Sequence, residues 1–107
     1  MQVLHWNSEL PYWQETITLD NKLYILTALW NGRSESWAVS LSTLEGEEIV
    51  SGRRLDIGVN ILNNVYNKNK PDGYLVVTPN DSDITIVTRD NMGSEVNLIF
   101  VSSDEIL

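Results

Sequence analysis

Apolar and polar residues alternate along most of the chain, and a period of two predicts β-strands that are buried on one face. Residues 22–30 depart from simple alternation because both faces of this stretch carry apolar side chains. One face holds Leu23, Ile25 and Leu29, and the other holds Tyr24, Leu26, Ala28 and Trp30. We therefore expect this strand to lie in the middle of a sheet.

Turn-forming residues separate the predicted strands. Asp20-Asn21, Asn31-Gly32 and Glu45-Gly46 divide the first four, and Asn, Asp and Gly tolerate the left-handed backbone angles of tight turns. The first four strands should therefore form a meander of antiparallel hairpins. The predicted strands cover residues 16–19, 22–30, 37–41, 49–50, 74–78, 84–88 and 96–101.

The middle of the chain fits two interpretations. Ile57, Ile61, Leu62 and Val65 have helix-like spacing, but the stretch also contains three asparagines, which are poor helix formers. Either a short helix near residues 57–66 or an irregular excursion is consistent with this pattern.

The predicted elements define the fold class. About seven short strands with Gly, Asn and Asp turns predict an all-β fold, a single small antiparallel β-sandwich or barrel. A chain of 107 residues is long enough for one domain with its own core. We expect an aromatic N-terminal arm at residues 1–13, a β domain at residues 14–102 and an acidic C-terminal tail at residues 103–107.

The charge balance limits the partners that the chain can bind. Fifteen acidic residues against seven basic ones give a formal net charge of −8. Specific nucleic-acid binding and an anionic membrane surface are both disfavoured, because each needs clustered Lys and Arg. An acidic surface would suit a wall past which DNA slides without sticking, since like charges repel.

Missing residue types and patterns exclude further classes. The chain has no cysteine, which rules out disulfides, thiolate catalysis and zinc sites built on cysteine. No apolar run approaches the roughly 18 residues of a membrane span. The first residues do not resemble a secretory signal, so we expect none.

The sequence offers little for catalysis. His5 is the single histidine and lies near the N-terminus, away from any triad-like spacing. Glu45, Glu47 and Glu48 crowd a hairpin tip, where exposure would prevent the raised pKa that an acid catalyst needs. Phosphate loops, metalloprotease helices and nucleophile elbows are absent. We therefore expect a protein that is not an enzyme and holds no cofactor.

Two neighbouring loops are candidates for a calcium site. Their oxygen-bearing side chains are Asn80, Asp81, Asp83, Asp90 and Asn91. Calcium favours such groups, but the spacing does not match an EF-hand loop, and Asn and Asp also stabilise turns through their own backbone. We therefore interpret these residues as turn formers and expect no metal.

Aromatic residues in the N-terminal arm are the best candidates for contacts. Trp6, Tyr12 and Trp13 would be costly to leave exposed, so we expect them to dock either on the domain's own core edge or on a neighbouring subunit. Trp30 and Trp37 lie within predicted strands and should be core residues.

The segment at residues 88–100 reads TRDNMGSEVNLIF and forms a polar turn that leads into an alternating strand. It resembles the C-terminal signature of the baseplate plug proteins of contractile phages. Residues 30–37, WNGRSESW, resemble a hairpin of that family, and residues 73–77, GYLVV, resemble its Gly-led strand. The chain differs from the family pattern at Asn91 and Met92, and at Arg53-Arg54, where a proline is expected.

Within the signature, Asp90 or Asn91 can cap the turn, and Gly93 can supply a backbone angle that other residues avoid. Arg89 has three options. It can pair with a local acid such as Asp90, bond backbone carbonyls of another strand, or bind a partner's carboxylate through its forked guanidinium.

The resemblance implies a structural virion protein at the centre of a contractile tail's baseplate. Its expected role is tail assembly and channel closure through contacts with hub, tail-tube and spike proteins. It would be present in several symmetric copies and made in the host cytoplasm. Interface candidates are Trp6, Tyr12, Trp13 and Arg89. The alternative is a sugar-binding β module for host recognition, which would need Trp6, Tyr12 or Trp13 exposed as a flat platform.

Overall fold

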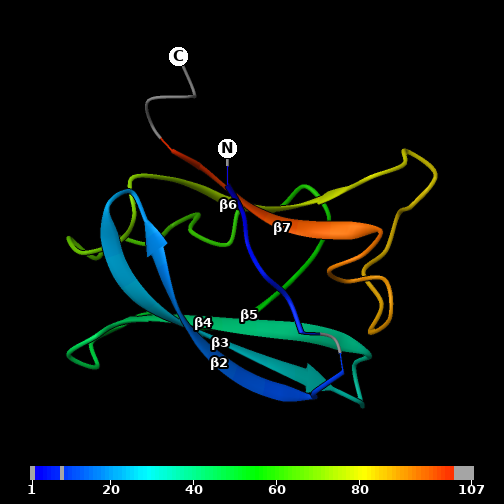
Figure 1. The fold of residues 1–107 in the computed structure, drawn as a ribbon, viewed down its shortest axis with the longest axis horizontal. Helices are drawn as coiled ribbons and strands as arrows, with labels where there is room; N and C mark the ends of the chain where they lie inside the picture. Colours follow the sequence, from blue (N-terminus) through cyan, green and yellow to red (C-terminus); the bar gives the residue numbers. More distant parts are fainter. Residues whose placement is uncertain (1, 8, 103–107) are drawn as a thin grey trace.

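Seven β-strands form two antiparallel sheets in the computed structural model, which describes residues 2–7 and 9–102 (Figure 1). The strands are β1 (Gln2–Val3), β2 (Tyr12–Leu19), β3 (Lys22–Asn31), β4 (Ser36–Thr43), β5 (Glu48–Arg54), β6 (Gly73–Pro79) and β7 (Val96–Ser102). The sheets face each other as a β-sandwich, not as a closed barrel, and the expected all-β class is confirmed.

The larger sheet has the strand order β2-β3-β4-β5, so the predicted meander is confirmed. Asp20 and Asn21 join β2 to β3 with φ angles of 55° and 65°, the left-handed values that a two-residue hairpin turn requires. β3 lies inside this sheet, as its two apolar faces predicted. Tyr24, Leu26 and Ala28 are buried on its inner face, whereas Leu23 and Leu29 are exposed on the outer face.

The smaller sheet has the order β1-β7-β6. Its β6 edge is covered by a chain segment from the middle of the sequence. The N–H of Gly58 donates to the carbonyl of Val77 (3.0 Å), and the N–H of Ile61 donates to the carbonyl of Leu75 (2.9 Å). This segment therefore closes an edge that would otherwise be open.

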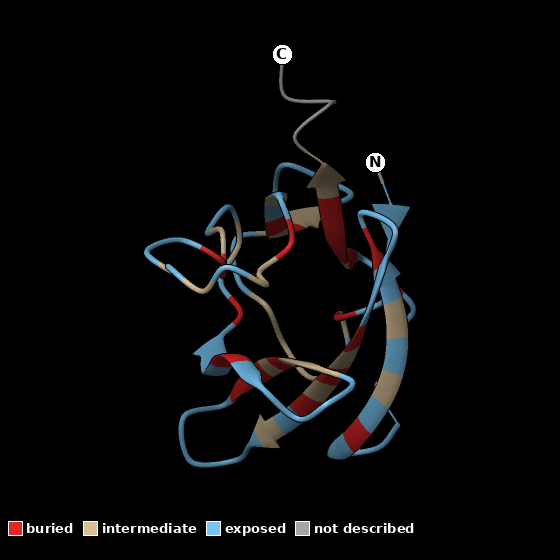
Figure 2. Ribbon diagram, turned by 90° about the vertical axis from the view of Figure 1, so that its left-hand side faces the viewer, coloured by how far each residue is buried: buried red, intermediate tan, exposed pale blue. Residues whose placement is uncertain are grey.

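The core fills the space between the two sheets, where buried positions face one another (Figure 2). Its largest fully buried side chains are Trp37, Tyr24, Leu19, Leu26, Leu41, Leu55, Ile61, Leu75, Met92, Leu98, Val39 and Val77. Both sheets contribute to one hydrophobic cluster, so the described residues make a single domain.

Residues 57–66 do not form the short helix that was one of the two interpretations, and the structure contains no helix within its described residues. The stretch is the irregular excursion, made of turns. The Asn60 side chain explains this outcome, because its Oδ1 accepts hydrogen bonds from the N–H groups of Leu62 (3.1 Å) and Leu75 (3.0 Å). Asn64 also adopts a φ of 63°, which no α-helix accommodates.

The strand predicted at residues 84–88 was also wrong. These residues belong to a long loop, 80–95, that joins β6 to β7. Asn80 closes the base of the loop, because its N–H donates to the carbonyl of Glu95 and its Nδ2 donates to the carbonyl of Ser94, both at 2.8 Å. Ile84 and Val87 pack against the core, but Ile86 is exposed, so burial in this loop does not follow the alternation of the sequence.

The N-terminal residues join the two sheets. Gln2 and Val3 pair with Phe100 and Ile99 of β7, and the chain then crosses to the larger sheet and enters β2 (Figure 1). Leu4 and Trp6 are buried on the way. Within the predicted arm, residues 2–3 thus form β1 and residues 12–13 begin β2. The predicted tail at residues 103–107 lies outside the described residues.

Candidate interaction site

The four tryptophans of the chain pack as one cluster between the sheets. The ring of Trp6 lies edge to face with Trp13 (centroids 4.9 Å apart, 84°) and with Trp37 (5.0 Å, 88°). Trp30 contacts Trp37 in a similar manner (5.5 Å, 64°). The cluster therefore joins the N-terminal segment to β2, β3 and β4.

Packing alone holds the centre of this cluster. The indole N–H groups of Trp6, Trp13 and Trp37 are buried, and none has a hydrogen-bond partner in the part of the chain that the structure describes. An unpaired buried donor costs about 1–3 kcal/mol. Each edge-to-face pair contributes about 0.5–1.5 kcal/mol beyond its buried area. Burial of the apolar ring surface must supply the rest of the offset.

Asn91 organises the polar turn of residues 88–93. Its Oδ1 accepts from the N–H of Thr88 (2.7 Å), and its own N–H donates to Oγ1 of Thr88 (3.1 Å). Its Nδ2 donates to the carbonyl of Ile86 (3.0 Å). The Asn91 carbonyl accepts from the N–H groups of Ser94, Glu95 and Val96. Asn91 thus caps the turn, as one of the two predicted candidates.

Replacing Asn91 by alanine is expected to lower the free energy of unfolding by about 1–3 kcal/mol, because the part-buried N–H of Thr88 loses its acceptor and the exposed carbonyl of Ile86 loses a donor. Asn91→Asp keeps the acceptor for Thr88 and should lose less. Urea unfolding of both variants checks this. Equal losses would show that the Thr88 bond contributes nothing.

Gly93 connects the same turn to the tryptophan cluster. Its φ is +90°, and a Cβ added there would lie 3.0 Å from the Cβ of Trp6 and 3.3 Å from its Cδ1. Only glycine combines that backbone angle with so close an approach. The turn therefore rests directly on Trp6, a contact between residues far apart in sequence that no local pattern could indicate.

The four predicted interface residues lie in different environments. Trp6 and Trp13 are buried in the chain's own core, at 9% and 8% exposure, which is the first of the two docking modes considered for them. Tyr12 is 56% exposed at the start of β2. The burial of Trp6 and Trp13 also removes most of the aromatic platform that a sugar-binding module would use.

Arg89 is partly exposed, and its Nη2 donates to the backbone carbonyl of Glu9 (3.3 Å). The second option for Arg89 was a bond to backbone carbonyls of another strand. The observed acceptor is a backbone carbonyl, but Glu9 lies just before β2 and not within a strand. Within the described residues Arg89 forms no ion pair. Since a guanidinium carries five N–H donors, most of them remain available.

The oxygen-bearing side chains considered for calcium serve the turns. Asp81 Oδ1 accepts from the N–H of Asp83 (3.0 Å), and Asn80 and Asn91 bond the loop backbone as described above. The described residues contain no group of three or more His, Asp or Glu side chains that could hold a metal ion.

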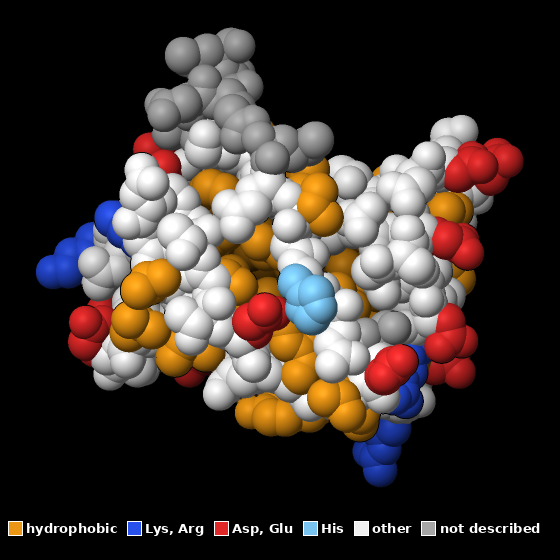
Figure 3. All heavy atoms as spheres, viewed as in Figure 1, with side chains coloured by type: hydrophobic (Ala, Val, Ile, Leu, Met, Phe, Trp, Pro, Cys, Tyr) orange, Lys and Arg blue, Asp and Glu red, His pale blue; other side chains and the backbone are white. Residues whose placement is uncertain are grey.

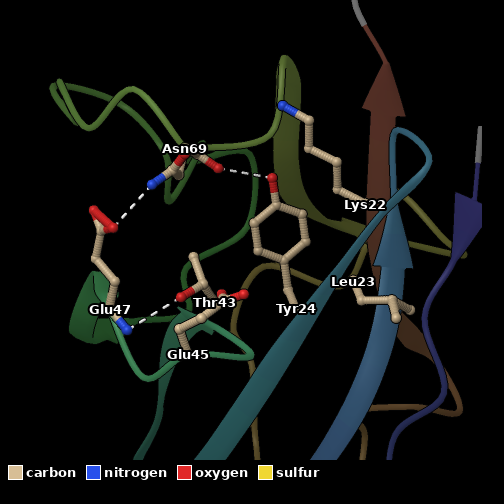
Figure 4. Close-up of a pocket in the computed structure, with 7 residues that line it drawn as sticks. All are labelled: Lys22, Leu23, Tyr24, Thr43, Glu45, Glu47 and Asn69. Atoms are coloured by element: carbon tan, nitrogen blue, oxygen red, sulfur yellow. Dashed lines mark hydrogen bonds between the residues drawn. The ribbon is translucent and has the colours of Figure 1, made fainter.

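A shallow hollow of about 390 Å³ lies beside the β4–β5 hairpin (Figure 4). The hydroxyl of Tyr24 donates to the carbonyl of Asn69 (2.8 Å), and Glu47 accepts from the side-chain amides of Asn67 (3.0 Å) and Asn69 (2.8 Å). Burial, and then the charge of Asp20, raise the pKa of Tyr24 above its ordinary 10.0. The polar groups thus bond one another and tie the 67–70 loop to the larger sheet.

A comparison with known protein families covers the polar turn of residues 88–93 and nearly all of the chain. The model of the family described as "Cyanophage baseplate Pam3 plug gp18" matches residues 1–104. The chain belongs to this family. Membership gives it a structural role in a phage tail baseplate, where it interacts with other baseplate or tail proteins. No curated protein matches the chain significantly. Among the described residues, no helix is long and apolar enough to cross a membrane.

The structure explains the other segments that resemble the plug family. Asn31 follows Trp30 at the end of β3, and its Oδ1 accepts from the N–H groups of Arg33 (3.0 Å) and Ser34 (3.3 Å), which shapes the turn into β4. Gly73 begins β6, where an added Cβ would overlap the carbonyl oxygen of Val101 on β7. These positions are required by turn geometry and strand packing.

Proposed function

We propose that the chain is a non-enzymatic plug at the centre of a contractile tail's baseplate, next to the hub, tail-tube and spike proteins. It acts in tail assembly and in closing the channel, through protein–protein contacts and in several symmetric copies. It is made in the host cytoplasm and incorporated into the virion.

The observation that carries this proposal is the extent of the family match. It covers residues 1–104 and therefore includes the N-terminal segment, both sheets and the polar turn of residues 88–93. These parts are held together by the tryptophan cluster, so the matched sequence corresponds to one packed unit. A rigid small domain suits a part that fills space between subunits.

Charge supports a position beside the DNA channel. The net charge of −8 repels DNA, so a plug of this composition would not retain the genome as it passes. On the face shown in Figure 3, basic side chains lie at the margins, and apolar side chains are visible across the centre. Such a face favours contacts with proteins over contacts with phosphate.

Tyr12 and Arg89 define the best candidate contact with a neighbouring subunit. The bond from Arg89 to Glu9 brings the guanidinium to the start of β2, close in sequence to Tyr12. Trp13, which follows Tyr12 in β2, packs edge to face against Trp6. Together Tyr12 and Arg89 offer an aromatic side chain and free guanidinium donors, which are frequent anchors of protein interfaces.

Arg89→Ala should reduce incorporation of the chain into baseplates about tenfold or more, because a lost charge-assisted bond to a partner carboxylate costs about 2–5 kcal/mol. The unfolding free energy should change by less than about 1 kcal/mol, since the Glu9 bond is long and exposed. Incorporation is measured by quantitative mass spectrometry of purified tails. Arg89→Lys, which keeps the charge but not the fork, should recover only part of it.

Two results would count against this role for Arg89. Normal incorporation of Arg89→Ala would show that no partner depends on the guanidinium. A loss of incorporation that follows a comparable loss of stability would show that Arg89 acts only within its own chain.

A further inference from the structure

The outer strands of the two sheets differ in how their edges are protected. β6 is covered by residues 57–61, and β1 is only two residues long. β5 has register shifts against β4 and carries Gly52 and two arginines, devices that discourage pairing. β2, in contrast, pairs with β3 in an unbroken register over its eight residues and contains no proline or lysine.

Backbone geometry identifies which groups of β2 point away from β3. The N–H of Trp30 donates to the carbonyl of Pro11 (2.7 Å), which makes Pro11 and Trp30 a hydrogen-bonded pair. Hydrogen-bonded and non-bonded pairs alternate in an antiparallel ladder. The backbone N–H and C=O groups of residues 12, 14, 16 and 18 therefore face outward.

One of these outward positions already has a partner. The carbonyl of Thr18 accepts a bond from Nε2 of Gln2 (3.0 Å). Tyr12, Gln14 and Thr16 remain, and all three residues are exposed. They are spaced evenly about Gln14, so the open part of the edge is symmetric about that residue.

We propose that a second copy of the chain pairs with this edge, β2 against β2 in antiparallel orientation, about a two-fold axis at Gln14. Gln14 then lies opposite Gln14 of the second copy, and Tyr12 lies opposite Thr16. The open N–H and C=O groups of all three residues are satisfied at once. The inference goes beyond the proposed function and does not depend on it.

Side chains are compatible with this register. Glu15 lies opposite Trp13 of the second copy, so the two Glu15 carboxylates do not face each other directly. The outer face beside the junction is uncharged on both β2 and β3. Its residues are Tyr12, Gln14, Thr16, Thr18, Leu23, Ile25, Thr27 and Leu29. Pairing would thus extend an uncharged sheet surface without placing like charges opposite each other.

A single introduced cysteine tests the register, because the chain has no other thiol. Opposed residues of a hydrogen-bonded pair have Cα atoms about 5.5 Å apart, within the range that a disulfide spans. Gln14→Cys should therefore give a covalent dimer on mild oxidation. Thr18→Cys is the matched control on the same face of β2. Its two cysteines would lie eight residues apart along the paired strands, about 26 Å, so this variant should give no covalent dimer.

Sedimentation equilibrium tests the pairing without cross-linking. The unmodified chain should double its mass as its concentration rises, whereas Gln14→Lys should stay monomeric because two lysines would meet at the axis. Gln14 is exposed, so thermal melting should confirm that this variant folds normally. A chain that remains monomeric up to about 1 mM, or one whose Gln14→Cys variant cross-links no better than Thr18→Cys, would overturn the proposal.

Discussion

Replacing Trp37 by alanine is expected to lower the free energy of unfolding by about 3–5 kcal/mol, the usual cost of removing a large aromatic side chain from a core. Trp37 is fully buried and contacts both Trp6 and Trp30. Its loss would leave a cavity where the N-terminal segment meets β3 and β4. Since domains of this kind are stable by only about 5–15 kcal/mol, the substitution should remove a large share of the total stability.

Trp30→Ala is the matched control for this prediction. Trp30 has the same ring and contacts Trp37, but it is only half-buried. Its replacement should therefore lower the free energy of unfolding by about 1–2 kcal/mol. Chemical unfolding followed by far-UV circular dichroism measures both values independently of tryptophan fluorescence. Comparable losses for the two variants would contradict the view that Trp37 lies at the centre of the cluster and Trp30 at its margin.

Gly93→Ala is expected to lower the free energy of unfolding by about 2–4 kcal/mol, from two causes that add. A residue with a Cβ is strained at a backbone φ of +90°. The added Cβ would also lie only 3.0 Å from the Cβ of Trp6, an atom fixed to the backbone. Trp6 cannot move away easily, because it is packed between Trp13 and Trp37. Chemical unfolding again gives the value.

Two other glycines separate these causes. Gly46 has a φ of +94° with nothing within 4 Å of an added Cβ, so Gly46→Ala should show only the backbone cost, about 1–2 kcal/mol. Gly32 has neither constraint, and Gly32→Ala should change stability by less than about 0.5 kcal/mol. If Gly93→Ala cost no more than Gly46→Ala, the contact with Trp6 would be of no energetic importance.

The local sequence pattern was sufficient to predict the topology of the larger sheet. Alternation and the Asp20-Asn21 and Asn31-Gly32 turns predicted the meander and the faces of β3, because both features depend on neighbours in sequence. The first strand began earlier than expected, at Tyr12 and not at residue 16. Tyr12 pairs with Leu29, so the length of β3 determines where β2 begins.

Pattern failed where side chains bond the backbone or where the pairing depends on the whole fold. Residues 84–88 alternate as a strand would, but Asn91 bonds the backbone at Ile86 and Thr88 and folds the segment into a loop. The pairing of Gln2 and Val3 with β7 depends on the whole fold, since a strand this short carries no periodic signal. Asn60 similarly directs its side chain to β6 and prevents a helix.

The candidate site could be predicted only in part. The Asn and Gly of the turn were identifiable because turn chemistry is local. The options for Arg89 included a bond to backbone, but Glu9 could not be named as its acceptor, since 80 residues separate the two. The contact of Gly93 with Trp6 also joins residues far apart in sequence, so it could not be predicted either. It ties the polar turn of residues 88–93 to the N-terminal segment.

The location of the chain in intact particles tests the central claim most directly. Cryo-electron microscopy of tails from the phage that encodes it should show density for this seven-stranded sandwich on the axis of the baseplate, next to the hub and the end of the tube. Tails that lack the chain, or that carry it at the periphery with the receptor-binding fibres, would contradict the account.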